Sequence, residues 1–215
     1  MGLVRGLPLK EFQCNEHCVS CLKGKQHKSS YKSIEESRTN ACLQLLHMDL
    51  FGPVKVMSLG KKKYCLVIID DYSRFTWTFF LFSKDEAAEV IKFFILQAEK
   101  QYSLPVKVIR SDNGTEFRNK NLDDFCMSKG IVRHYNIPRT PEQNGVVEMK
   151  NRTLIEAART MLDDSVLPLY FWVEAINTAC YVQNKVLINK RHSKTSYEII
   201  NNLKPLGLLD VNVSF

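Results

Sequence analysis

The stretch Ser83-Lys84-Asp85-Glu86-Ala87-Ala88-Glu89-Val90-Ile91 marks a change of pattern within the 215-residue chain. Its Ser-x-x-Glu start has the form of a helix capping box, and the apolar residues that follow recur at helical spacing, which predicts a helix to about Tyr102. Before it, three short apolar or β-branched runs are joined by tight connections. They predict an antiparallel meander of strands at Leu43–Leu50, Tyr64–Asp70 and Phe75–Phe82.

After this helix, strands and helices alternate. Val106–Ile109 and Ile131–Tyr135 are predicted strands, and between them residues 119–129 are a predicted short helix that Gly130 closes. A strand, helix, strand order implies parallel pairing. Two long helical patterns then run from the Pro138–Pro141 loop to about Asp164, and from about Pro168 to Leu187. The order βββαβαβαα predicts an α/β fold, with a five-stranded mixed sheet and helices on both faces.

Composition excludes several classes of protein. With 45% hydrophobic and 25% charged residues, the chain is neither disordered nor collagen-like. Its longest apolar stretches fall far short of the roughly 20 residues that cross a bilayer, so we expect no membrane partner. The start, Met1 to Arg5, does not resemble a secretory signal, so we expect a chain that is not secreted and stays in a reducing compartment. Four irregularly spaced cysteines fit that expectation as small core residues: Cys42, Cys65, Cys126 and Cys180.

The charge balance favours a polyanionic partner. Thirty Lys and Arg against 23 Asp and Glu give a net charge of +7, and the positive charge is spread along the chain. Residues 49–166 nevertheless contain many acidic residues, and these need a role of their own.

Carboxylates stand where two predicted strands end. Asp49 closes the first strand, and Asp112 closes the fourth in Val108-Ile109-Arg110-Ser111-Asp112-Asn113-Gly114. Side chains at the carboxyl ends of neighbouring parallel strands converge on one crevice. Glu148 lies early in the first long helix, on a face that it shares with Arg152. This face adjoins a predicted buried stripe of Val147, Leu154, Ala158 and Met161.

Three carboxylates held close together repel one another, and a divalent cation best explains such an arrangement. Oxygen ligands of this kind suit Mg²⁺ or Mn²⁺. Two such ions stabilise both the attacking and the leaving oxygen of a phosphodiester during in-line displacement. The pattern therefore indicates phosphoryl transfer.

Each of these residues also has an ordinary structural interpretation. Asp112-Asn113-Gly114 is typical of a turn, and Glu148 alone is typical of a solvated helix residue paired with Arg152. Asp70 and Asp71 also end a strand and compete with Asp49. Because they precede a hairpin, we interpret them as structural capping residues.

Several motifs resemble the integrase catalytic core of copia-type LTR retrotransposon Pol polyproteins, a family related to retroviral integrases. Asp112 and Glu148 are separated by 35 residues, which matches the spacing in the Asp, Asp, Glu triad of that family. The resemblance covers roughly residues 1–200. It rests on His47-Met48-Asp49-Leu50-Phe51-Gly52-Pro53, Asp70-Asp71-Tyr72-Ser73-Arg74-Phe75-Thr76-Trp77, Ser111-Asp112-Asn113-Gly114-Thr115-Glu116-Phe117, Pro141-Glu142-Gln143-Asn144-Gly145-Val146-Val147-Glu148 and Phe171-Trp172-Val173-Glu174-Ala175.

The resemblance implies a ribonuclease H-like fold and a polynucleotidyl transferase that joins element DNA ends to target DNA. Asp49, Asp112 and Glu148 would be the catalytic ligands of two Mg²⁺ (or Mn²⁺) ions. The family also implies a homo-oligomer on DNA, a nuclear site of action and assembly in cytoplasmic particles.

Further residues are candidates for DNA contact. By the same resemblance, Asn113 would support the second strand-end ligand, and Asn144, Asn151 and Arg152 would approach DNA ends. Lys150, Arg152 and Arg159 place cations where phosphates bind without sequence readout, although a solvated helix face explains them as well. We interpret Lys61-Lys62-Lys63 as a soluble hairpin tip rather than a DNA clamp.

The ends of the chain depart from the family pattern. Cys18-Val19-Ser20-Cys21 and the basic residues after it resemble the second half of a zinc-binding pre-integrase domain. Structural zinc needs four ligands in a tetrahedron. Cys14 and His17 would crowd such a site, so we expect no closed zinc site from this remnant. The predicted organisation is a zinc-domain remnant (1–28), a linker (29–41), the catalytic core (42–205) and a tail (206–215).

Three functions therefore stand open. The first is a metal-dependent core that processes DNA ends and transfers strands, in either a full or a truncated copy. The second is a ribonuclease H-like nuclease that hydrolyses without joining. The third is a catalytically inactive relic or co-opted module that binds nucleic acid.

Overall fold

The structure is a computed structural model that describes residues 39–135 and 141–203. Its main sheet has five strands in the order β3-β2-β1-β4-β5, in which β1 pairs antiparallel with β2 and parallel with β4. This confirms the predicted five-stranded mixed sheet. The strands are β1 (Leu45–Phe51), β2 (Tyr64–Asp70), β3 (Thr76–Leu81), β4 (Val108–Ser111) and β5 (Val132–Tyr135).

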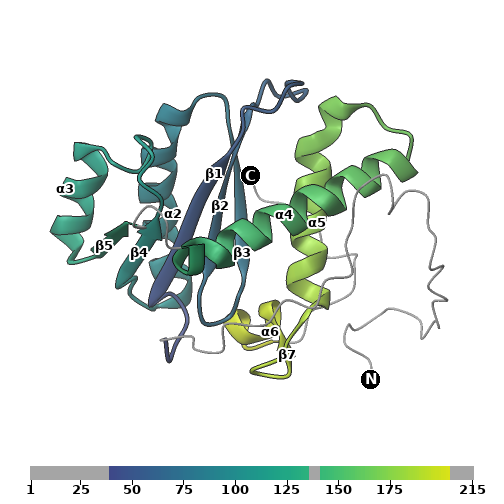
Figure 1. Cartoon of the computed structure of the whole chain (residues 1–215). Helices are drawn as coiled ribbons and strands as arrows, with labels where there is room; N and C mark the ends of the chain where they lie inside the picture. Colours follow the sequence, from purple (N-terminus) through teal and green to yellow (C-terminus); the bar gives the residue numbers. More distant parts are fainter. Residues whose placement is uncertain (1–38, 136–140, 204–215) are drawn as a thin grey trace.

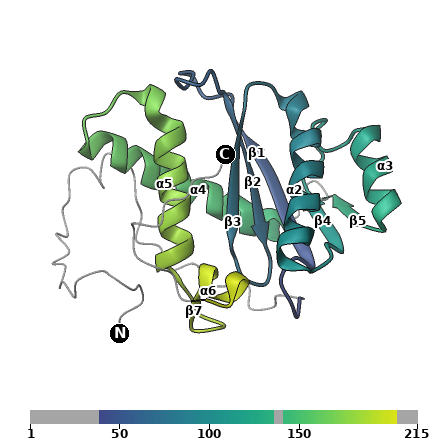
Figure 2. The ribbon, with the colours of Figure 1, turned by 180° about the vertical axis from the view of Figure 1, so that it is seen from behind.

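Helices cover both faces of the sheet (Figures 1 and 2). Helices α2 and α3 pack on one face, and α4 and α5 on the other. A short hairpin, β6–β7, and helix α6 follow α5. The helices are α2 (Ala87–Tyr102), α3 (Lys120–Lys129), α4 (Pro141–Asp164), α5 (Trp172–Val186) and α6 (Ser196–Asn201), and the hairpin strands are β6 (Ile188–Asn189) and β7 (Lys194–Thr195).

Strand β2 explains why the sheet needs helices on both sides. Its residues are apolar at nearly every position, and successive side chains of a strand point to opposite faces. Leu66 and Ile68 pack with α2, whereas Cys65, Val67 and Ile69 pack with α4 and α5. A strand buried on both faces requires two layers of helix.

The predicted helix signals are present as hydrogen bonds. The Ser83 N–H donates to Glu86 Oε1 at 3.2 Å, which is one half of the capping box. Asn119 Oδ1 accepts from the Leu122 N–H at 2.9 Å at the start of α3. Gly130 ends α3 with a φ of 69°, a left-handed conformation in which glycine avoids the steric cost of a Cβ.

Some predicted boundaries were wrong by a few residues. The fourth strand begins at Val108 rather than Val106, because the Val106 N–H donates to Glu99 Oε1 at 2.9 Å instead of to a strand. A 3₁₀ turn, η2 (Leu169–Phe171), precedes α5 where we predicted one continuous helix. On α4, Leu162 rather than Met161 is fully buried in the apolar stripe.

The two aspartates that end β2 are structural, as predicted. Asp70 accepts hydrogen bonds from the Leu43 N–H at 2.7 Å and from the Ser73 N–H at 2.8 Å. Asp71 Oδ2 accepts from Thr39 Oγ1 at 2.9 Å, so a residue of the predicted linker packs on the core. His47 Nε2 lies 3.0 Å from Asp71 Oδ1, and burial lowers the pKa of His47, so a neutral imidazole donates to this carboxylate.

The edge strand β3 has an unusual side-chain partner on α5. The Thr76 N–H donates to Asn184 Oδ1 at 3.0 Å, and Asn184 Nδ2 donates back to the Thr76 carbonyl at 2.7 Å. One buried amide thus satisfies both main-chain groups of an edge residue, as a neighbouring strand would.

Two sequence expectations concern the whole described region. None of the described helices is long and apolar enough to cross a membrane. The four predicted core cysteines are buried and free.

Candidate active site

The parallel pairing of β1 and β4 places two of the three predicted carboxylates side by side. Leu45 pairs with Val108 and His47 with Arg110. Extending this register by two residues places Asp49 beside Asp112. Both side chains are half-buried. Asp112 directly follows β4, as predicted, whereas Asp49 does not close its strand, because β1 continues two residues further to Phe51.

Glu148 reaches the same place from α4. With Asp49 it lines a groove of about 410 Å³, and Glu148 is exposed to solvent. The pKa of Asp49 is raised to about 6, mainly by burial, then by the charges of Asp112 and, more weakly, Glu148. The structure therefore brings the three carboxylates within electrostatic reach of one another. The groove is completed by Phe51, Asn151, Arg152, Ile155, Glu156 and Arg159.

The donor chemistry of Asp49, Asp112 and Glu148 fits Mg²⁺ or Mn²⁺, because all three candidate ligands are carboxylates. The like charges that raise the pKa of Asp49 are those that a divalent cation would offset. Within residues 39–135 and 141–203, however, no three His, Cys, Asp or Glu side chains are gathered closely enough to hold one ion. Binding an ion would therefore require the carboxylates to draw closer together.

Asp112 combines the turn role and the site role that the sequence left open. Its Oδ1 accepts from the Gly114 N–H at 3.0 Å, which is the turn interpretation. The loop is anchored by Phe117, which is fully buried and whose N–H donates to the Gly114 carbonyl at 3.0 Å. Asn113, the predicted support for this ligand, lies in the loop and is exposed.

Asn151 does not face solvent as a DNA contact would. It is buried, and its Nδ2 donates to Asp49 Oδ2 at 2.6 Å. Its Oδ1 has no hydrogen-bond partner among the described residues. We therefore assign Asn151 to the positioning of Asp49, a role that the sequence did not indicate because the two residues are 102 positions apart.

The predicted cations of α4 separate onto two faces. Arg152 and Arg159 are exposed and line the groove beside Glu148. Lys150 lies on the other side, near the Cys180 thiol of α5, and burial lowers the pKa of Lys150. The structure thus brings Arg152 and Arg159 to the carboxylates and takes Lys150 away from them. The side chain of Asn144 and the possible zinc remnant, Cys18 and Cys21, lie outside the described residues.

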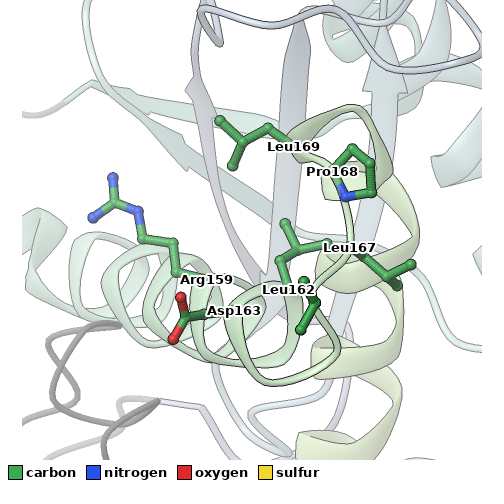
Figure 3. Close-up of a pocket in the computed structure, with 7 residues that line it drawn as sticks. Arg159, Leu162, Asp163, Leu167, Pro168 and Leu169 are labelled. Carbon is green, nitrogen blue, oxygen red and sulfur yellow. The ribbon is translucent and has the colours of Figure 1, made fainter.

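A second cavity, of about 600 Å³, lies where α4 leads into η2. Figure 3 shows apolar side chains such as Leu162, Leu167 and Leu169 around it, with Arg159 and Asp163 beside them. Arg159 lines both cavities, so this arginine connects them along α4. Because the second cavity is mainly apolar and contains one carboxylate, the groove at Asp49 is the better candidate for phosphoryl transfer.

Comparison of sequences relates the chain to integrases and to retrotransposon polyproteins. A family model described as "Integrase core domain" matches residues 40–141. The chain is also 40% identical over 168 residues to the retrovirus-related Pol polyprotein from transposon TNT 1-94 of Nicotiana tabacum. That alignment covers 78% of this chain and 13% of the tobacco polyprotein, so the chain spans a small part of that relative.

Comparison of structures gives retroviral integrases. The HTLV-2 integrase catalytic core domain in complex with magnesium is 23% identical, with a TM-score of 0.55, covering 74% of this chain and 97% of that one. The simian T-cell lymphotropic virus intasome, in complex with PP2A regulatory subunit B56 gamma, is 20% identical with a TM-score of 0.60, covering 85% and 62%. The catalytic core of BIV integrase is 23% identical with a TM-score of 0.53, covering 74% and 95%. These likenesses confirm the ribonuclease H-like fold.

Proposed function

Because this chain matches the integrase core domain model over residues 40–141 and is 40% identical to a retrovirus-related Pol polyprotein, we propose that it is a metal-dependent polynucleotidyl transferase core that joins DNA ends to target DNA. Asp49, Asp112 and Glu148 would hold two Mg²⁺ or Mn²⁺ ions. The proposal also assigns DNA as the partner, a homo-oligomer as the DNA-bound form, and the nucleus as the place of action.

The observation that carries this proposal is the electrostatics of Asp49. Asp49 is a half-buried carboxylate held near two further carboxylates. Burial is the main cause that raises its pKa to about 6, and the charges of Asp112 and Glu148 raise it further. Without a cation, such an arrangement is unfavourable, since each charge disfavours the ionisation of the others. Functional sites are where such unfavourable arrangements tend to occur.

The residues around the carboxylates support a transfer reaction. Asn151 donates to Asp49 Oδ2 and the Gly114 N–H donates to Asp112 Oδ1, so each of these two carboxylates is oriented by a fixed donor. Arg152 and Arg159 line the groove, where their guanidinium groups would bind phosphates of a nucleic acid. The bound ions would stabilise charge on the attacking and leaving oxygens of the phosphodiester.

The test is a strand-joining assay on a branched oligonucleotide with Mg²⁺ or Mn²⁺, comparing the natural chain with Asp112→Asn. The substitution removes the charge but keeps the oxygen that accepts from the Gly114 N–H, so the loop should survive. We expect a loss larger than the roughly 10–100-fold that removal of an outer-sphere partner costs. Asp124→Asn, an exposed aspartate on α3, is the matched control and should keep full activity.

The same assay separates the three functions. Joined product supports the transferase, and cleaved product without joining supports a nuclease. Full activity of Asp112→Asn would show that the triad assignment is wrong. A folded chain that binds DNA without metal and yields no product would support a binding module. A rise in melting temperature with Mg²⁺, present in the natural chain and absent in Asp112→Asn, would test the metal site apart from turnover.

A further inference from the structure

The turn of the β6–β7 hairpin carries a concentration of positive charge that the proposed active site does not use. The turn reads Lys190-Arg191-His192-Ser193 and is followed at once by Lys194; Lys190, Arg191 and Lys194 are exposed. Between residues 185 and 203 there are four Lys or Arg and a single acidic residue, Glu198.

The hairpin holds these cations in a defined shape. The Asn189 carbonyl accepts from the His192 N–H at 3.2 Å and the Ser193 N–H at 2.8 Å. The Asn189 side chain accepts from the Arg191 N–H at 3.0 Å. Glu198, the acidic residue of this segment, caps α6, where its Oε2 accepts from the Thr195 N–H at 2.8 Å at the base of the hairpin.

The hairpin is also fixed to the end of the main sheet. The His192 ring packs against the Tyr72 ring at an angle of 51°, with ring centroids 4.5 Å apart, and the Arg191 guanidinium lies 5.8 Å from the centre of the same ring. Burial and the Arg191 charge lower the pKa of His192, so the positive charge of the tip comes from its lysines and arginine. A charged turn that is held on an aromatic ring loses little freedom when it binds a ligand.

This surface is separate from the carboxylate groove. Tyr72 follows β2, whose last residue, Asp70, pairs with Leu46 near the start of β1. Asp49 lies three residues further along β1, about 10 Å away, toward the opposite end of the strand. Figure 1 shows β7 and α6 below the sheet, beside the carboxyl end of α5.

We propose that the β6–β7 hairpin is a second nucleic-acid contact, which binds the phosphate backbone through Lys190, Arg191 and Lys194 without reading sequence. The choice of nucleic acid as the polyanion rests on the proposed function. Lysine ammonium groups act as point charges toward phosphates and arginine adds a planar fork, and such contacts give affinity without base specificity. Leu187 and Ile188 at the base of the hairpin are exposed, so an anionic lipid surface is the rival ligand that the experiment must separate.

The experiment measures binding of the full chain to a fluorescent DNA duplex, in EDTA, across a salt series. Three variants are compared with the natural chain. The first is Lys190→Gln/Arg191→Gln/Lys194→Gln. The second, Lys190→Arg/Arg191→Lys/Lys194→Arg, keeps the charge. The third, Lys100→Gln/Lys107→Gln/Lys120→Gln, removes three charges from exposed lysines on or next to α2, β4 and α3.

Each lost phosphate contact should reduce the slope of log affinity against log salt by about 0.9, so the first variant should lose about 2.7. Between about 50 and 200 mM salt, the natural chain should then lose about 40-fold more affinity than this variant. The charge-keeping variant and the triple variant of Lys100, Lys107 and Lys120 should retain the natural slope.

An unchanged slope in the first variant, an equal drop in the Lys100, Lys107 and Lys120 variant, or no binding of DNA by the natural chain would overturn the proposal. Binding to phosphatidylserine vesicles that the first variant loses, with DNA binding intact, would also overturn it in favour of a lipid contact. Because EDTA removes metal, this result is independent of strand joining. A chain that joins nothing but shows the slope change would contradict the proposed function and leave the hairpin contact standing.

Discussion

Asn184→Ala is expected to destabilise the fold by about 2–4 kcal/mol, because it removes the side chain that bonds both main-chain groups of the edge residue Thr76. Asn184 is buried, and its amide bonds the Thr76 N–H at 3.0 Å and the Thr76 carbonyl at 2.7 Å. A buried main-chain group left without a partner costs roughly 1–3 kcal/mol. The Thr76 carbonyl keeps Cys180 Sγ as a weak donor at 3.3 Å, so the cost of its lost hydrogen bond should be near the lower end of that range of roughly 1–3 kcal/mol.

Urea unfolding followed by tryptophan fluorescence measures this loss. With a slope of about 2 kcal/mol per M, the midpoint should fall by about 1–2 M. Asn177→Ala is the matched control on the same helix, because Asn177 is exposed and accepts only a long 3.4 Å hydrogen bond from Thr78. The control should change stability by less than about 0.5 kcal/mol. Equal effects of the two variants would refute the view that Asn184 replaces a neighbouring strand.

Three further comparisons test other parts of the fold. Gly145→Ala should stabilise the chain by about 0.5–1 kcal/mol, because Gly145 lies in a helix and an added Cβ meets nothing within 4 Å. Gly130→Ala should instead destabilise it by about 1 kcal/mol, because Gly130 has a φ of 69°. The urea midpoint should rise for the first variant and fall for the second. Because the pKa of His47 is lowered in the folded chain, His47 contributes stability above the unfolded value of about 6.5, and this stability is lost as the pH falls below that value. The urea midpoint of His47→Gln should therefore depend less on pH in that range than the midpoint of the natural chain. Equal pH dependence of the two midpoints would contradict the assignment. Lys150→Met should leave DNA affinity unchanged while Arg159→Gln weakens it, and the reverse order in a binding titration would place the DNA on the other face of α4.

Local patterns account for most of what the sequence predicted. The capping box at Ser83 and the apolar run of β2 act over a few residues, and each is visible as a hydrogen bond or a buried face. The prediction that Asp49 and Asp112 lie close together needed one additional step, the rule that neighbouring parallel strands end at a common edge of the sheet. The strand order therefore predicted their proximity before any side-chain geometry was known.

Contacts between distant residues left no such local signal. Asn151 bonds Asp49 across 102 positions, and Asn184 bonds Thr76 across 108. Lys150 is a different case, because it lies three residues after Val147 and four before Leu154, both in the buried stripe. Helical spacing alone therefore put Lys150 closer to the buried face than Arg152, and weighing that spacing would have removed it from the DNA contacts.

The parallel pairing of β1 and β4 also has a consequence for synthesis of the chain on the ribosome. Strands β1 to β3 pair as hairpins, but β4 joins β1 only after α2 has been made, and Glu148 follows Asp49 by 99 residues. At about 5–20 residues per second, this interval lasts about 5–20 s. During that time a nascent chain can hold a paired meander with one carboxylate of the groove in place. The complete acidic set thus exists only in chains whose translation has passed α4, which keeps partial products free of it.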